Sequence, residues 1–416
     1  DVYKRQRRVA PAGDLGPHPG GLAPVGILRT AVRDSRTKRN GSAARLSVCL
    51  SAAFSAGHLS PAFSAARLRA GCLAILLLAG ALLGAPAGSS ARSSPLRPSS
   101  WGGEVAFGWD SNLLSSSTAE TRAFDTGGGD SFFAVDRLED ARARAGFWGR
   151  WEVPSFYKSL RIEGSYERFE ALHESIVGSG VYAIGLRQKL PDGSRIDLSA
   201  AYCPQIYLRH RTNKEALPGE PQFRPEASRQ MELEIAHSRP FAGTRLEASI
   251  DYETERRIRW FRERDEETWT AGLNVEVPLV SSIDLIGAGF VGGSRTVAPN
   301  REPGLDRSHR QAITGLRLSA EPGLPAGPWE MQAGTRWKFR DYTTDDPTDS
   351  SRYHRNDRIV SWDVRIGRPM GAFVPFVSYE GSLRRVHLPS GAQSSNEEGE
   401  YDDTLISLGV QWEFPR

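Results

Sequence analysis

The sequence predicts an all-β protein, an antiparallel up-and-down β-barrel that crosses a membrane with about 14 strands, within a range of about 12 to 16. Three observations support this prediction. Apolar and polar residues alternate with a period of two between Trp101 and Phe414, short turns alternate with other connections, and a stretch typical of a secretory signal precedes the first strand.

The composition excludes a membrane protein built from helices. The chain has 416 residues, 25% of them charged, and a mean hydropathy of −0.43. A membrane-spanning helix needs an apolar run of about 20 residues, and none occurs after residue 92. A barrel is missed by such a search because its lipid-facing and lumen-facing residues alternate.

Charge is distributed unevenly along the chain. Residues 1–100 contain 14 of the 53 basic residues and 3 of the 50 acidic ones, so residues 101–416 carry 39 basic and 47 acidic residues, a net charge of −8. Binding to nucleic acid requires a concentrated basic face. We therefore expect no nucleic-acid partner.

Residues 67–91 are organised as a cleavable signal peptide. Arg67 and Arg69 precede an apolar stretch over 70–83, and mostly small residues follow over 84–91. A basic region, a short apolar region and a small-residue cleavage site are the three parts of such a signal. We expect residues 92–416 to form the exported barrel, in the outer membrane of a Gram-negative bacterium.

Residues 1–66 are basic and rich in alanine, proline and glycine, and the first methionine is Met231. Two interpretations stay open. These residues are a spurious upstream translation, with the true start at a non-ATG codon near Val48 or Leu68, or they form a disordered basic leader.

Fourteen alternating runs follow Trp101, and the last is the clearest. Its even-numbered residues from Ile406 to Phe414 are apolar, whereas most of its odd-numbered residues are polar or small. A C-terminal strand with a terminal aromatic residue resembles the signal by which outer-membrane barrels are recognised for insertion, although Pro415 and Arg416 follow here. This resemblance implies the barrel-insertion machinery as a partner and assigns the signal to Leu408, Val410, Trp412 and Phe414.

The connections between runs alternate in kind, as periplasmic turns and surface loops do in a barrel. An even number of strands brings both ends to the periplasm, and the first and last strands can pair. Short turns are expected near 154–159, 191–194, 239–243, 278–282, 321–328 and 369–372. The other connections, most of them longer and polar, are expected near 111–132, 171–176, 209–227, 261–266, 298–308, 343–357 and 388–403.

Aromatic residues are expected near strand ends, where interfacial girdles lie in membrane barrels; a soluble β protein would place them mid-strand. The residues assigned to the girdles are Trp151, Tyr166, Tyr202, Tyr252, Trp269, Trp329, Trp337, Trp362, Tyr379 and Trp412.

Charged residues on the predicted inward face separate by sign, which would produce a transverse field in a water-filled lumen. The alternative is that they pair across the lumen and plug the barrel. The acidic arc is assigned to Glu232, Glu234, Glu247, Asp251, Glu253, Glu255 and Glu276. The basic arc is assigned to Arg142, Arg144, Arg150, Arg336, Lys338 and Arg340.

Several residues resemble parts of cofactor-binding, catalytic or metal sites, but each has a simpler structural explanation. Gly287, Gly289 and Gly292 match a dinucleotide-binding pattern, but no helix follows them, so strand packing is the preferred explanation. The lone Cys203 lacks a base and is interpreted as a small filler. Histidines near the loops lack metal-ligand spacing and are interpreted as solvated rim residues, so the sequence predicts no cofactor and no metal.

Two histidines could belong to a hydrolase at the rim, which would need a Ser/His or Asp/His group there. His309 lies near Asp306 and Ser308, and His354 lies near Asp349 and Asp357. Proximity within a loop is not catalytic geometry, so we expect no enzymatic activity and retain the hydrolase as the third alternative.

The end of the first run, Gly108 to Leu113, reads Gly-Trp-Asp-Ser-Asn-Leu. It resembles the Gly-Tyr-Asp-Asp/Ser-Asn pattern that opens many outer-membrane barrels, including those of surface-lipoprotein assembly and exopolysaccharide-export proteins. The resemblance implies a barrel, and as one possible role the export or assembly of a polysaccharide or lipoprotein. No 34-residue helical repeat precedes the barrel. Passive diffusion of small polar solutes is therefore the leading expectation.

Overall fold

The computed structural model describes residues 99–112, 114, 121–122, 138–154, 159–172, 178–212, 223–257, 265–280, 282–297, 306–324, 327–344, 352–388 and 400–415. The expected leader and signal peptide, residues 1–91, lie outside the described residues. Within these described stretches no helix is long and apolar enough to cross a membrane.

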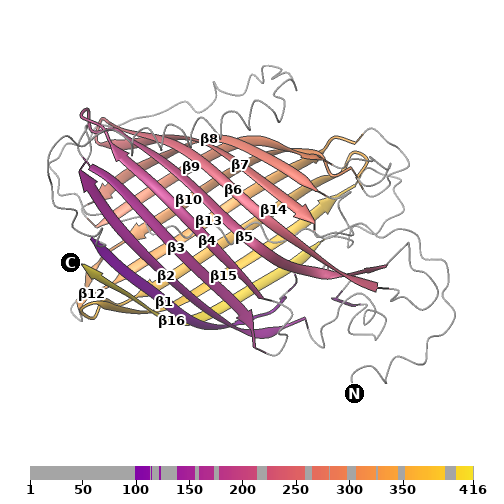
Figure 1. Cartoon of the computed structure of the whole chain (residues 1–416), viewed down its shortest axis with the longest axis horizontal. Helices are drawn as coiled ribbons and strands as arrows, with labels where there is room; N and C mark the ends of the chain where they lie inside the picture. Colours follow the sequence, from indigo (N-terminus) through magenta and orange to yellow (C-terminus); the bar gives the residue numbers. More distant parts are fainter. Residues whose placement is uncertain are drawn as a thin grey trace, which may run out of the picture. The chain divides into compact units, whose positions relative to one another are not determined.

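Fourteen antiparallel strands form a closed barrel, which confirms the predicted fold class and strand number. Each strand pairs with its neighbours in the chain, and β1 pairs with β16 to close the ring; Figure 1 shows the strands tilted side by side. The barrel strands are β1 (Ser100–Asp110), β2 (Asp140–Pro154), β3 (Ser159–Ala171), β4 (Gly178–Lys189), β5 (Arg195–Thr212), β6 (Phe223–Phe241), β7 (Thr244–Arg257), β8 (Glu266–Val280), β9 (Ile283–Thr296), β10 (His309–Ala320), β13 (Glu330–Tyr342), β14 (Asn356–Gly367), β15 (Phe373–His387) and β16 (Tyr401–Pro415).

The closing pair is in register over the whole of β1, from Ser100 opposite Pro415 to Asp110 opposite Leu405. Aromatic rings cover this seam on the outside, with the Trp101 and Phe414 centroids 4.8 Å apart. Gly102 allows the close approach of the backbones, because a Cβ atom there would lie 2.3 Å from the carbonyl oxygen of Trp412. Closure leaves the barrel without a free edge strand.

The two ends of the barrel differ, as the alternating connections predict. Short turns join β2 to β3, β4 to β5, β6 to β7, β8 to β9 and β14 to β15. Between β6 and β7, Ala242 and Gly243 both have positive φ, at 48° and 81°, which is the geometry of a type I′ hairpin turn. The turn between β10 and β13 includes a small hairpin of β11 (Gly323–Leu324) and β12 (Gly327–Pro328).

The connection expected over 209–227 is shorter than predicted, because β5 continues to Thr212 and β6 starts at Phe223. β4 pairs with β5 only as far as Tyr202, and β7 pairs with β6 only from Ser228. The outer parts of β5 and β6 therefore pair with each other beyond the ring, with two register shifts on β5. A ribbon that has no neighbouring strands beside it does not need apolar alternation, so its sequence resembles that of a loop.

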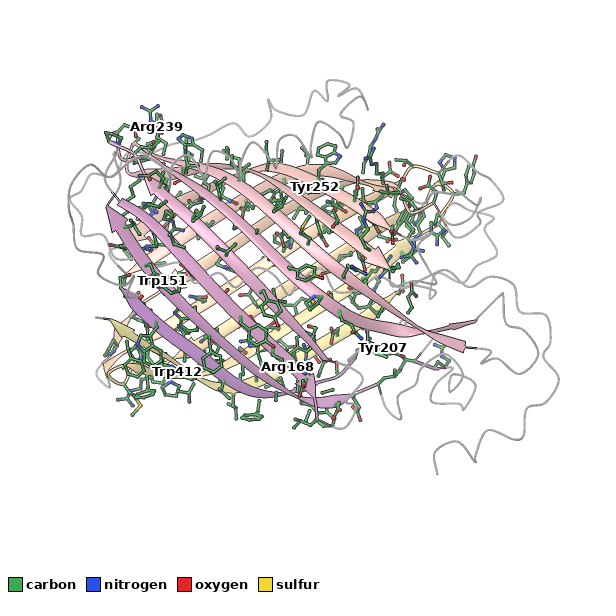
Figure 2. All side chains as sticks on the ribbon, in the orientation of Figure 1. Trp151, Arg168, Tyr207, Arg239, Tyr252 and Trp412 are labelled. Atoms are coloured by element: carbon green, nitrogen blue, oxygen red, sulfur yellow. The ribbon has the colours of Figure 1, made fainter. Side chains whose placement is uncertain are left out.

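The aromatic residues assigned to the girdles share the outward face, except Trp329, which lies before β13. In Figure 2, Trp151 and Trp412 lie toward the end of the barrel that carries the chain's C-terminal residues. Five others, in contrast, lie near the middle of their strands: Tyr166 on β3, Tyr252 on β7, Trp337 on β13, Trp362 on β14 and Tyr379 on β15. The prediction of strand-end positions is therefore wrong for these five, because alternation specifies a face and not a depth.

Candidate functional site on the inner face of the barrel

The two faces of the barrel wall have opposite chemistry. On the outward face large apolar side chains are exposed, including Phe107 (58%), Ile250 (58%) and Leu408 (62%). Phe107 and Leu408 are paired across the β1–β16 seam, so the apolar surface continues across the closure. The alternate residues of the same strands point inward, and many of them are charged.

The basic residues predicted on β2 are on the inward face and have acidic partners on neighbouring strands. Arg150 is almost fully buried, with 4% of its surface exposed, and reaches past β1 to β16. Ion pairs of this kind neutralise the β2 wall. The pairs are Arg142 with Asp110 at 2.5 Å, Arg144 with Glu104, and Arg150 with Glu163 at 3.3 Å and Glu413 at 3.1 Å.

The basic residues on β13 are different. Lys338 and Arg340 are 8% and 5% exposed, and neither has an ion pair among the residues that the structure describes. The Nε and Nη1 atoms of Arg340 are buried without a hydrogen-bond acceptor. Four strands lie between β2 and β13, so the six predicted bases occupy two separate stretches of the wall.

The predicted acidic residues lie together on β6, β7 and β8. Glu232 is opposite Glu253, and Glu234 is opposite Asp251, so carboxylates are adjacent on the inner surface. Several of them have local partners, which are either neutral hydrogen-bond donors or arginines that offset the negative charge. These contacts are Thr270 Oγ1 to Asp251 at 2.9 Å, Asn274 Nδ2 to Glu247 at 3.0 Å, Arg195 to Glu247 at 3.0 Å, Arg257 to Glu255, and Arg245 to Glu276 at 3.6 Å.

Charges from non-adjacent strands also meet inside the barrel. Arg365 Nη1 on β14 lies 2.9 Å from Glu104 Oε2 on β1, although β15 and β16 lie between these strands in the wall. Lys338 interacts electrostatically with Glu253, and three strands separate β13 from β7. The inner face is therefore a connected network of charges in which acid and base interact over more than one strand.

Sequence reasoning missed the inward charges on β14 and β15. Asp357 accepts hydrogen bonds from Arg355 Nε at 2.7 Å, from the Tyr342 hydroxyl at 3.2 Å, and from Arg384. The side chains of Asp357 and Arg384 are 0% and 1% exposed. Period-two alternation places both on the inward face, so the same signal that selected β13 could have found them.

The side chains considered for hydrolysis are engaged elsewhere. Ser308 Oγ donates to Asp306 Oδ1 at 2.5 Å, while His309 Nδ1 lies 2.9 Å from the carbonyl oxygen of Arg307. His309 is only 4% exposed, so its interpretation as a solvated rim residue is wrong. His354 and His387 are exposed. Asp349 and His173 lie outside the described residues, as does the side chain of His210.

No group of three metal-binding side chains occurs in the described part of the chain. Cys203 is buried and free. The glycine pattern from Gly287 to Gly292 lies within β9, and a Cβ at Gly292 would lie 2.0 Å from the carbonyl oxygen of Trp269. Close packing of β8 against β9 therefore explains Gly292 without a nucleotide.

The residues assigned to the insertion signal lie on the outward face of β16. Leu408 and Val410 are 62% and 39% exposed. Trp412 contacts Phe147 with ring centroids 6.1 Å apart, and Phe414 contacts Phe373 at 6.0 Å.

No protein-family model matches the chain, and no curated protein matches it in sequence. Among solved structures, the outer membrane protein opdK from Pseudomonas aeruginosa aligns at 10% identity over 76% of this chain and 99% of that one, with a TM-score of 0.33. CdiB from Acinetobacter baumannii aligns at 9% identity over 76% of this chain and 60% of that one, with a TM-score of 0.42. Similarity at this level assigns neither family nor function.

Proposed function

We propose that the chain is an outer-membrane β-barrel of a Gram-negative bacterium that lets small polar solutes diffuse passively through its lumen. The observation that carries this proposal is the opposite chemistry of the two faces of a closed wall. Apolar side chains such as Leu408, 62% exposed, match the hydrocarbon of a bilayer, whereas the charged inner face matches water.

The strand number is compatible with an open path. Barrels of about 8 strands are filled by their own side chains, whereas those of about 16 to 18 strands leave a wide aqueous channel. Fourteen strands lie between these limits, so the inner side chains decide whether a path remains. The acidic residues of β6–β8 and the bases of β2 and β13 would line that path and orient a polar solute in their field.

Planar-bilayer conductance of the protein purified from bacterial outer membranes tests the pore. We expect stepwise ohmic openings, with ion selectivity read from the reversal potential under a salt gradient. A folded protein that never opens would refute the pore. It would favour the second candidate, a non-conducting barrel for export or surface assembly of a polysaccharide or lipoprotein, which the charge contacts across the interior support.

The lipid-facing surface has a separate test. Leu408→Arg places a charge on the apolar face near the middle of β16, and we expect a loss of about 2–4 kcal/mol in the free energy of unfolding from lipid vesicles. Asp402→Arg is the matched control on the same strand and face, because the Asp402 side chain is already 70% exposed. Equal losses in both variants would contradict a membrane-facing surface.

Insertion by the barrel-insertion machinery is also a proposal, supported by the outward apolar face of β16. We expect Phe414→Ser to slow the insertion of the protein into vesicles that contain this machinery and to leave its refolding in detergent unchanged. An unchanged insertion rate would contradict this role for Phe414.

A further inference from the structure

We propose that Arg340 and Lys338 form a binding site for an anionic group, a carboxylate or a phosphate, on the inner face of β13. The site lies toward the end of the barrel that carries the longer connections. The proposal rests on the proposed function because it names the class of solute that the pore would admit.

The first observation is that both cations are buried without forming an ion pair. Arg340 and Lys338 are 5% and 8% exposed, and no ion pair to either occurs in the described part of the barrel. Burying a cation is strongly unfavourable unless an opposite charge and hydrogen bonds compensate it. Two inward cations in successive inward positions of one strand repel each other as well.

The second observation is that the acidic residue paired opposite Arg340 already accepts hydrogen bonds from other side chains. Asp357 is opposite Arg340 in the β13–β14 pairing. Its Oδ1 accepts from Arg355 at 2.7 Å, and its Oδ2 accepts from Arg384 and from the Tyr342 hydroxyl. One carboxylate thus accepts from two other arginines. Arg340 interacts with it electrostatically but donates no hydrogen bond to it in the described barrel.

The third observation is that several unsatisfied polar atoms lie around Arg340. Its own Nε and Nη1, and the Nε of Arg384, are buried donors without acceptors. These unpaired guanidinium N–H groups can each donate a charge-assisted hydrogen bond to the oxygen of a carboxylate or a phosphate.

The opposite wall does not remove the need for an anion. Glu253 and Glu266, on β7 and β8, interact electrostatically with Lys338. These carboxylates form no ion pair with Arg340 or Lys338 within the described strands. An anion bound to Arg340 would add the missing negative charge where the hydrogen-bond donors are.

Calorimetric titration of the detergent-solubilised protein with inorganic phosphate and, separately, with acetate tests the site at constant ionic strength. We expect saturable binding of at least one of them, and the tighter one identifies the anion class. Arg340→Gln should weaken binding about tenfold or more, because a charge-assisted hydrogen-bond pair is lost. Arg317→Gln is the matched control, since Arg317 is an inward arginine on β10 that is 45% exposed and lies 3.7 Å from Asp363. The affinity of the Arg317→Gln variant for the anion should remain within about twofold of that of the unchanged protein.

Absence of saturable binding to the unchanged protein would overturn the site, because water would then satisfy the guanidinium. Equal binding by Arg340→Gln would also overturn it. Folding of each variant is checked by its heat-modifiable mobility in gels. If Arg340→Gln does not fold, Arg340→Lys is tested in its place, since it keeps the charge but loses the fixed directions of the guanidinium N–H groups and should still bind more weakly. A barrel that conducts but binds neither anion refutes the site alone, and one that binds but does not conduct refutes the pore alone.

Discussion

Replacing Asp357 by alanine removes the carboxylate that two buried arginines share. The side chains of Asp357, Arg384 and Arg355 are 0%, 1% and 4% exposed, so solvent does not screen these pairs. Removing one partner of a buried ion pair costs about 3–5 kcal/mol because the other charge remains buried. A hydrogen bond to a charged group contributes about 1.5–3 kcal/mol, and at least two are lost here. We therefore expect Asp357→Ala to reduce the free energy of unfolding by about 3–5 kcal/mol.

Urea unfolding in lipid vesicles, followed by tryptophan fluorescence, measures this loss. Asp363→Ala is the control on the same strand and the same inward face. Asp363 and its partner Arg317 are 41% and 45% exposed and lie 3.7 Å apart, so this pair should contribute less than about 1 kcal/mol. Similar losses in the two variants would refute the argument that burial determines the strength of these pairs.

Three further changes test local features. Ala242→Gly should raise the urea midpoint by the equivalent of about 1 kcal/mol, because a non-glycine residue at φ 48° is strained; a lower midpoint would contradict this. Gly292→Ala should cost about 1–3 kcal/mol through overpacking, since its Cβ would meet backbone at 2.0 Å, whereas Gly289→Ala has nothing within 4 Å and should be nearly neutral in the same assay. Hydrogen bonds from the Ser194 hydroxyl and N–H hold the pKa of Asp192 below its ordinary value. The carboxylate therefore stabilises the β4–β5 turn above an unfolded pKa of about 3.9, and this contribution is lost as pH falls through the lower folded value. An NMR titration that gave the Asp192 carboxyl a pKa at or above the ordinary value would contradict this prediction.

The faces of the strands could be predicted from the sequence because a period of two leaves no ambiguity about which residues share a side. In β16 the even-numbered residues from Ile406 to Phe414 lie outward, as their apolar character indicates. Stretches of polar residues also located most of the turns. This signal failed for the outer part of β5 and β6, where a polar ribbon is held by its own pairing beyond the neighbouring strands.

The contacts between inward charges could not be predicted in the same way. Parity places Glu104 and Arg365 on the inner face, but their 2.9 Å contact depends on the register of β14, β15, β16 and β1 together. The burial of His309 also depends on how neighbouring strands pair. Its sequence neighbours are polar, yet its ring lies 5.5 Å from that of Tyr342, a residue on the adjacent strand β13.

The pairing of Ser100 with Pro415 makes the connectivity of the ring cyclic. Every other hydrogen-bonded neighbour is also adjacent in the order of barrel strands, so no pairing depends on where the chain is opened. A circular permutant that joins these two ends by a short linker and opens the chain within 213–222 would keep every strand partner. In such a permutant the β1–β16 pair becomes an ordinary local hairpin, and the β5–β6 pair becomes the long-range step that completes folding.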